Sequence, residues 1–211
     1  RRDARAGVGM TLLAVVRHGP TEWNGARKLQ GMSDIPLSGE GRALVATWQL
    51  PDEFRAWRIL SSPLARAQET AKLLGAQALT VEPLLREMSF GDWEGFTIQE
   101  LAASNSADEF QALAARGLDM LPPNGESPRM VIERLKILLK RLAEEGEPTV
   151  AVCHKGIIRA LLALATGWPM LGKQPVRLDW SSLHCFRLGK DGAPTLDRIN
   201  VSLRATAGSA P

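Results

Sequence analysis

Short apolar runs alternate with amphipathic stretches along most of this chain. A short, continuous apolar run is typical of a strand buried on both faces, and apolar residues repeating at intervals of three and four are typical of a helix with one buried face. The predicted strands cover residues 11–16, 58–61, 79–81 and 149–153. The predicted helices cover about 39–50, 63–74, 127–145 and 155–164.

Local signals mark several ends of these helices. Ser62 followed by Pro63 predicts an N-cap and a first helical residue, and Ser127 followed by Pro128 predicts the same start for the longest helix. A glycine follows two of the predicted helices, as expected at a helix C-terminus. The tail, about 176–200, alternates apolar and polar residues and predicts two or three further strands.

Strands that alternate with helices predict an α/β fold. The expected architecture is a three-layer sandwich, with a mostly parallel sheet and helices on both faces. Residues 84–125 are irregular and are predicted to form a cap inserted over the site. The expected organisation is a single domain over residues 10–204. Residues 1–9 are basic and polar, and they are predicted to be a disordered leader or tag.

Composition argues against several classes of protein. The formal net charge of the 211 residues is only +3, and the basic residues are dispersed rather than clustered, which argues against nucleic acid as a partner. The two cysteines do not have the spacing of a zinc site or a disulfide framework, so a reduced, cytoplasmic environment is expected. No apolar run reaches the roughly 20 residues that span a membrane.

Three predicted strand ends carry the candidate chemistry. The first ends in Arg17 and His18, the second is followed by Arg66 one turn into a helix, and the fourth ends in His154 and Lys155. In α/β sheets the ligand lies beyond the carboxyl ends of the strands, where helix N-termini favour an anion. Arginine also binds phosphoryl oxygens in a bidentate manner. These segments therefore predict a phosphate site.

The same residue types predict how the phosphate reacts. A neutral histidine ring nitrogen can attack phosphorus and form a covalent intermediate. Phosphoryl transfer depends mostly on positioning and on charge stabilisation, which two arginines and a second histidine can supply without a metal ion or another cofactor. The leaving oxygen needs a proton, and Glu87, just after the third predicted strand, is the candidate acid.

At this point the motifs resemble those of a known family. Residues 16–24 read VRHGPTEWN and resemble the RHG signature of the histidine phosphatase superfamily, the phosphoglycerate-mutase-like group. Residues 61–70 (SSPLARAQET) resemble its second arginine motif, and residues 154–159 (HKGIIR) resemble its second histidine motif. Glu87 followed by FGDWEG resembles its general-acid region. The ordered resemblance covers about residues 11–200.

The resemblance implies a role for each candidate residue. His18 would be the nucleophile, and Glu87 would donate the proton and later activate water. The phosphate would be held by Arg17, Arg66 and His154, with Asn24 as a further contact. Lys155 stands where relatives often have glycine, and it would add a cation near the phosphate or simply be solvated.

The FGDWEG segment resembles the phosphatase branch, so the expected enzyme is a histidine acid-type phosphatase, a phosphoric monoester hydrolase. It would be metal-independent and would act on a small phosphorylated metabolite. Two alternatives remain: a phosphoglycerate-type mutase, and a non-catalytic protein that binds a phosphorylated ligand. A homodimer is left open.

Several residues also have simpler interpretations. Arg66 could pair with Glu69 on its helix surface, Asn24 could cap a turn, and Glu94 lies in the same loop as Glu87. Zinc binding by His154 with Cys153 is disfavoured because adjacent strand residues face opposite ways. His184 is expected to be structural. Residues 167–173 match GxxxxGK, but the following Gln174 and the preceding helix argue against a nucleotide site.

Overall fold

The computed structural model describes residues 10–104 and 112–203. It contains a six-stranded sheet with the order β3-β2-β4-β1-β5-β6. The first four strands in this order are parallel, β5 is antiparallel to β1, and β6 is antiparallel to β5. The strands are β1 (Thr11–Arg17), β2 (Arg58–Ser61), β3 (Thr80–Val81), β4 (Thr149–Cys153), β5 (Ser182–Leu188) and β6 (Pro194–Ser202). All four predicted strands are confirmed, and the tail forms two more.

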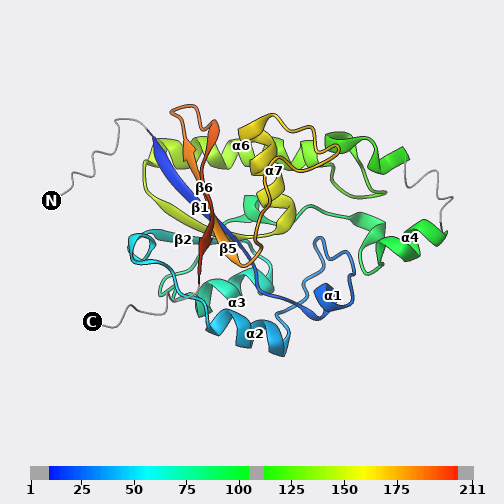
Figure 1. Cartoon of the computed structure of the whole chain (residues 1–211), viewed down its shortest axis with the longest axis horizontal. Helices are drawn as coiled ribbons and strands as arrows, with labels where there is room; N and C mark the ends of the chain where they lie inside the picture. The colour runs from blue at the N-terminus through cyan, green and yellow to red at the C-terminus, as the bar shows by residue number, and fades with distance from the viewer. Residues whose placement is uncertain (1–9, 105–111, 204–211) are drawn as a thin grey trace.

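Helices cover both faces of this sheet (Figure 1). The α-helices are α1 (Glu22–Gly25), α2 (Gly39–Ala46), α3 (Ala65–Leu73), α4 (Ile98–Ser104), α6 (Pro128–Glu145) and α7 (Lys155–Thr166). The short 3-10 helices are η1 (Asp52–Phe54), η2 (Pro83–Leu85), η3 (Gly91–Trp93) and η4 (Gly117–Asp119). Helices α2 and α3 pack on one face and α6 and α7 on the other, which confirms the three-layer α/β fold.

Burial on both faces explains why residues 12–16 of the central strand β1 are all apolar. Leu13 and Val15 join the core under α6 and α7, whereas Ala14 and Val16 join the core under α2 and α3. A strand with a helix layer on each face must bury both sets of side chains. Burial of this strand therefore follows from its position in the middle of the sheet, between β4 and β5.

The register between β1 and β4 brings two histidines together. Arg17 pairs with Cys153, and the backbone N–H of His18 donates to the carbonyl oxygen of Cys153 over 2.9 Å. His18 therefore follows the end of β1 at the level where His154 follows the end of β4. Because the two strands are parallel neighbours, both histidines emerge at the same edge of the sheet.

The predicted start of α3 is wrong. The helix begins at Ala65, and its N-cap residue Leu64 makes no side-chain capping bond. The Ser62 hydroxyl accepts from the N–H of Leu64 and contacts His154, so it does not cap the helix. The Asp34 carboxylate, from a distant loop, accepts from the N–H of Ala65 over 2.7 Å instead. A tertiary contact thus replaces the local cap that the sequence indicated.

The helix predicted at 39–50 is also shorter than expected. Helix α2 ends at Ala46, and the next N–H groups bond three residues back, to Leu44 and Val45. Pro51 follows soon after. The longest helix agrees with its prediction: Ser127 accepts from the N–H of Met130, Pro128 occupies the first turn, and Gly146 ends the helix with φ of 68°.

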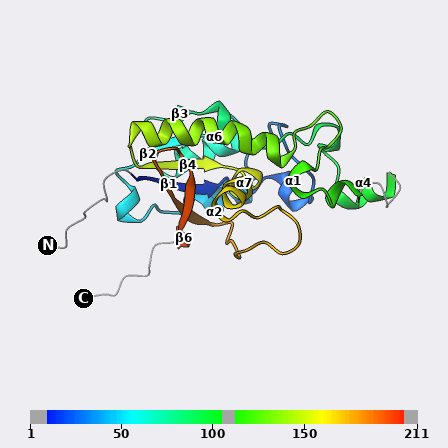
Figure 2. The ribbon, with the colours of Figure 1, turned by 90° about the horizontal axis from the view of Figure 1, so that it is seen from above.

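The segment predicted as a cap lies at one end of the molecule. Its described parts form η3, α4 and η4, and Figure 2 shows α4 and α1 beyond the same end of the sheet. Three ranges lie outside the described residues: 1–9, 105–111 and 204–211. They include the predicted leader, part of the predicted cap and the last residue of the predicted domain. No helix in the two described ranges is long and apolar enough to cross a membrane.

Candidate active site

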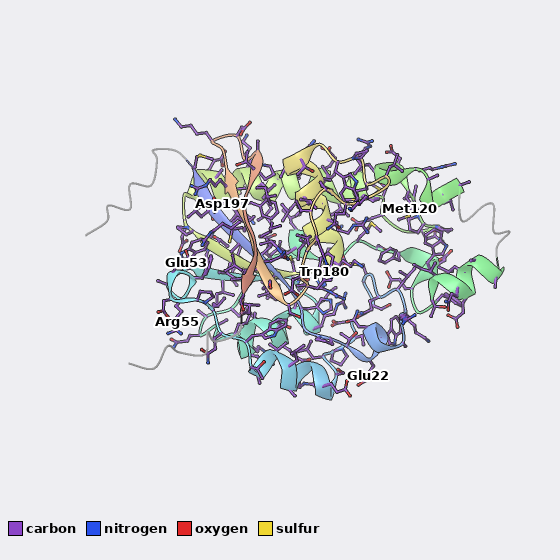
Figure 3. All side chains as sticks on the ribbon, viewed as in Figure 1. Glu22, Glu53, Arg55, Met120, Trp180 and Asp197 are labelled. Atoms are coloured by element: carbon purple, nitrogen blue, oxygen red, sulfur yellow. The ribbon has the colours of Figure 1, made fainter. Side chains whose placement is uncertain are left out.

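A cavity of about 530 Å³ opens at the carboxyl ends of β1, β2 and β4. Six of the seven predicted site residues line it: Arg17, His18, Asn24, Arg66, Glu87 and Lys155. The segment predicted to be a cap contributes apolar lining, including Met120. Figure 3 shows Met120 on the side of the molecule where α4 lies. The seventh residue, His154, is fully buried behind the lining, with its ring centroid 5.1 Å from that of His18.

His18 is held as a neutral imidazole. Its Nδ1 lies 2.6 Å from the carbonyl oxygen of Gly19, which accepts only if Nδ1 carries the ring proton. The other ring nitrogen, Nε2, is therefore unprotonated. Burial lowers the pKa of His18 well below its usual value, and the charges of Arg17 and Arg66 lower it further. A neutral ring with a free lone pair at Nε2 is the form that can attack phosphorus.

His154 is oriented by Ser62. Its Nε2 lies 2.6 Å from the Ser62 hydroxyl, which also accepts from the N–H of Leu64. The Ser62 hydroxyl can donate its proton to Nε2, and in that tautomer the ring proton is on Nδ1, which has no hydrogen-bond partner within the described part of the chain. An unsatisfied buried donor beside two arginines is expected to bind an oxygen of an anion.

Arg66 is fixed by backbone carbonyls. Its Nη1 donates to the carbonyl oxygen of Ser33 and its Nη2 to that of Gly31, each over 2.8 Å, and only 1% of the residue is exposed. Glu69, the alternative partner on the same helix, pairs instead with Arg42 over 2.9 Å. The buried Nε atoms of Arg66 and Arg17 have no partner among the described residues. Both guanidinium groups therefore keep donors for a ligand.

Glu87 is the only carboxylate among the described residues that line the cavity. Its Oε1 accepts from the N–H of Met88 over 2.9 Å, and its Oε2 accepts from the N–H of Gly156 over 3.2 Å. Burial raises the pKa of Glu87, although these hydrogen bonds and the charges of Arg66 and Arg17 oppose that shift. A raised pKa favours the protonated carboxyl, as a proton donor requires.

Glu94, the competing carboxylate in the same loop, has a different role. Its two oxygens accept from the backbone N–H groups of Met32, Ser33 and Phe90 and from the Ser33 hydroxyl. Glu94 therefore supports the loop whose carbonyls hold Arg66.

Asn24 and Lys155 lie on the cavity wall with other contacts. The Oδ1 of Asn24 accepts from the N–H of Thr21 and completes a capping box, so the turn-capping interpretation is correct, and its Nδ2 is the group left to donate to a ligand. The Lys155 ammonium lies 5.3 Å from the centroid of the Trp180 ring, and the Arg17 guanidinium lies 5.9 Å from the same ring. Figure 3 shows Trp180 near the centre of the molecule.

The sequence did not identify Arg134, a buried arginine of α6. It donates to the carbonyl oxygens of Leu84, Arg86 and Glu87 and pairs with the Glu126 carboxylate. Glu126 in turn accepts from the N–H of Ser89. The loop that carries Glu87 is thus fastened to α6. No sequence signal distinguishes Arg134 from the solvated arginines of the same helix.

We expect Arg134→Met to lower the free energy of unfolding by about 3 kcal/mol, because it removes the buried partner of the Glu126 charge and leaves only the more exposed Arg86. A double variant, Arg134→Met with Glu126→Gln, should recover a substantial part of that loss. Urea denaturation of the three proteins measures both effects. Equal stability of the single and double variants would show that the ion pair is not the cause.

We expect Gly156→Ala to displace the Glu87 carboxylate with little effect on the fold. A Cβ at Gly156 would lie 2.4 Å from Oε1 of Glu87, which is the movable end of a side chain. The resemblance implies that Glu87 protonates the leaving oxygen, so displacing its carboxyl should lower kcat for an alkyl phosphate about 10- to 100-fold. Gly39→Ala, where the added methyl meets open space, is the matched control. Unchanged kcat in Gly156→Ala would contradict the assigned position of the acid.

Comparisons with known proteins agree with this geometry. The family model of the histidine phosphatase superfamily (branch 1) matches residues 13–202. The chain is 36% identical over 185 residues to phosphoglycerate mutase-like protein 4 of Arabidopsis thaliana, covering 83% of this chain and 79% of that protein. It is 35% identical over 179 residues to glucosyl-3-phosphoglycerate phosphatase of Mycolicibacterium vanbaalenii, covering 76% and 78%.

A solved structure shows the same architecture. The crystal structure of a putative alpha-ribazole-5'-P phosphatase from Escherichia coli superposes with a TM-score of 0.76 at 25% identity, covering 93% of this chain and 98% of that chain. The sequence motifs, the sheet and the family match cover the same residues. The chain therefore belongs to the histidine phosphatase superfamily.

Proposed function

We propose that this protein is a phosphatase that hydrolyses small phosphorylated metabolites through a phosphohistidine on His18. The observation that carries the proposal is the neutral His18 ring, placed with two buried arginines and one protonatable carboxyl around a single cavity. Relatives named as phosphatases of small phosphorylated compounds support it. A protein that only binds phosphate would need neither a nucleophile nor an acid.

In the first step, Nε2 of His18 attacks phosphorus and forms the N–P bond. The ester P–O bond breaks, and the leaving oxygen takes the proton of Glu87. Arg17, Arg66 and the Nδ1–H of His154 stabilise the charge on the three phosphoryl oxygens, with Asn24 as a further donor and Lys155 beside them.

In the second step, the Glu87 carboxylate accepts a proton from water as the water oxygen attacks phosphorus. The N–P bond breaks, inorganic phosphate leaves, and His18 returns to its neutral form. Every proton transfer uses a group of this chain, so the proposed cycle uses neither a metal ion nor a cofactor.

We also propose an acid-type enzyme that works in the cytoplasm, with residues 10–204 acting as one domain and 84–125 as its cap. The lowered pKa of His18 keeps the nucleophile neutral at mildly acidic pH, and the raised pKa of Glu87 favours its protonated form there. The two cysteines are free and buried, which fits a reducing compartment.

Hydrolysis of p-nitrophenyl phosphate and of 3-phosphoglycerate in excess EDTA, with water enriched in oxygen-18, tests this function. We expect phosphate release that EDTA does not reduce, with one solvent oxygen in each phosphate. Isomerisation of 3-phosphoglycerate without phosphate release would indicate a mutase. Phosphate binding without either reaction would indicate a binding protein.

A further inference from the structure

The cavity carries more positive charge than one phosphate group requires. Among the described residues, six cationic side chains and a single carboxylate, Glu87, line it. Arg17 and Arg66 are assigned to the ester phosphate, which leaves Arg27, Lys28, Lys155 and Arg159. Of these four, Lys155 and Arg159 belong to the rigid helix α7 and lie one turn apart on it.

Arg159 has the features of a side chain prepared for an anion. Its guanidinium packs over the Trp168 ring at 5.1 Å from the centroid. Its Nε is buried and has no hydrogen-bond partner within the described ranges. By contrast, Arg58 and Arg134, which are also largely buried, pair with the carboxylates of Glu145 and Glu126. A half-buried guanidinium is normally paired or hydrogen-bonded, so Arg159 is an exception.

The position of Arg159 relates it to the phosphate site. Lys155 and Arg17 both lie against the Trp180 ring, and after burial the charge of Arg17 is the largest cause of the lowered pKa of Lys155, so the two cations belong to one region of the site. The Cβ atoms of residues four apart on a helix face are about 6 Å from each other. Arg159 therefore follows Lys155 along the cavity wall, one helical turn further from Arg17. The three cations form a row that begins at the phosphate site.

We propose that Arg159, assisted by Lys155, forms a second anion subsite, and that the preferred substrates carry a second anionic group, a carboxylate or a second phosphate. This inference deepens the proposed function, on which it rests. The second group would lie about one helical turn from the ester phosphate. The guanidinium of Arg159 is already packed against Trp168, so binding the anion costs little side-chain entropy.

The test compares substrate pairs that differ in the second anion. The first pair is 3-phosphoglycerate and glycerol 3-phosphate, which share a three-carbon skeleton and differ by a carboxylate. The second pair is fructose 1,6-bisphosphate and fructose 6-phosphate, which differ by a phosphate. We expect the wild type to favour one dianionic member in kcat/KM. Arg159→Met should lower kcat/KM for that member by about 10- to 100-fold, mainly through KM, because it removes a charge-assisted hydrogen bond.

Two controls separate this effect from general damage. The kcat/KM for p-nitrophenyl phosphate should change less than about twofold in Arg159→Met, since that substrate has no second anion. Lys190→Gln removes one positive charge from the turn between β5 and β6, outside the cavity lining, and should leave all substrates unaffected. Equal losses for both members of each pair in Arg159→Met, or no preference in the wild type, would overturn the subsite.

Calorimetric titration of the His18→Ala protein keeps the test independent of turnover. 3-Phosphoglycerate and fructose 1,6-bisphosphate should each be compared with its partner lacking the second anion. We expect one dianionic ligand to bind about tenfold more tightly than its partner, and Arg159→Met in the same background should abolish the difference. If the wild type lacks phosphatase activity but this difference persists, the proposed function is wrong and the subsite stands. If activity is present and the difference is absent, only the subsite is wrong.

Discussion

The His18→Ala variant is expected to lose about four or more orders of magnitude in kcat for every phosphate ester. The ring is the only group in the site that the proposed mechanism uses to form a bond to phosphorus, and removing a covalent nucleophile eliminates that route entirely. Steady-state phosphate release in EDTA, with the enzyme concentration raised for the variant, measures the loss.

The control for this prediction is His184, the buried histidine that lies within a strand of the sheet. His184 lies in β5, is fully buried, and has a pKa lowered by burial to about 4, yet it does not line the cavity. His184→Asn should keep kcat within about threefold if it folds, and thermal unfolding of both variants checks the fold. A His18→Ala protein that folds and retains more than about one percent of kcat would place the nucleophile elsewhere.

The second large effect is expected for Glu87→Gln. Glutamine keeps the size of the side chain but cannot give a proton to the leaving oxygen, so kcat for an alkyl phosphate should fall about 10²- to 10⁴-fold. p-Nitrophenolate leaves without protonation, and formation of the phosphohistidine from p-nitrophenyl phosphate should therefore be much less affected. Rapid-quench measurement of the first turnover separates this step from hydrolysis. Equal losses for both esters in the first turnover would contradict proton donation by Glu87.

The pH dependence should identify the same two groups. His18 must be neutral, so kcat/KM rises with pH through its lowered pKa, and that limb lies well on the acidic side of an ordinary histidine. Glu87 must be protonated, so kcat/KM for an alkyl ester falls as pH rises through its raised pKa. The profile is therefore a bell, and Glu87→Gln should remove its alkaline limb only. An alkaline limb that persists in this variant would assign it to another group.

The strands of the fold were predictable where burial on both faces requires a run of apolar residues. The runs that became β1 and β4 are apolar throughout because helices cover both faces of the sheet, and that pattern is visible without a structure. The start of α3 was not predictable. A serine before a proline resembles a local cap, whereas here Ser62 binds His154 and the cap comes from Asp34, far away in the sequence.

The grouping of the candidate site residues around one cavity was predictable for a related reason. His18, Arg66 and His154 follow strand ends or begin helices, and parallel strands bring their carboxyl ends together. The residues that support the site were not predictable from the sequence. Arg134 and Arg159 occupy helix positions where an arginine is normally solvated, and only the tertiary structure shows that one holds the Glu87 loop and the other faces the cavity.

Trapping the phosphorylated enzyme tests the central claim most directly. The protein would be mixed with p-nitrophenyl phosphate in EDTA, quenched within milliseconds in alkaline denaturant, digested, and examined by mass spectrometry for a phosphorylated peptide. We predict one phosphoryl group on the His18 imidazole, stable to base, labile to acid, and absent from His18→Ala. A phosphoryl group on any other residue, or phosphate release during turnover with no phosphorylated His18 in rapidly quenched samples, would contradict the mechanism.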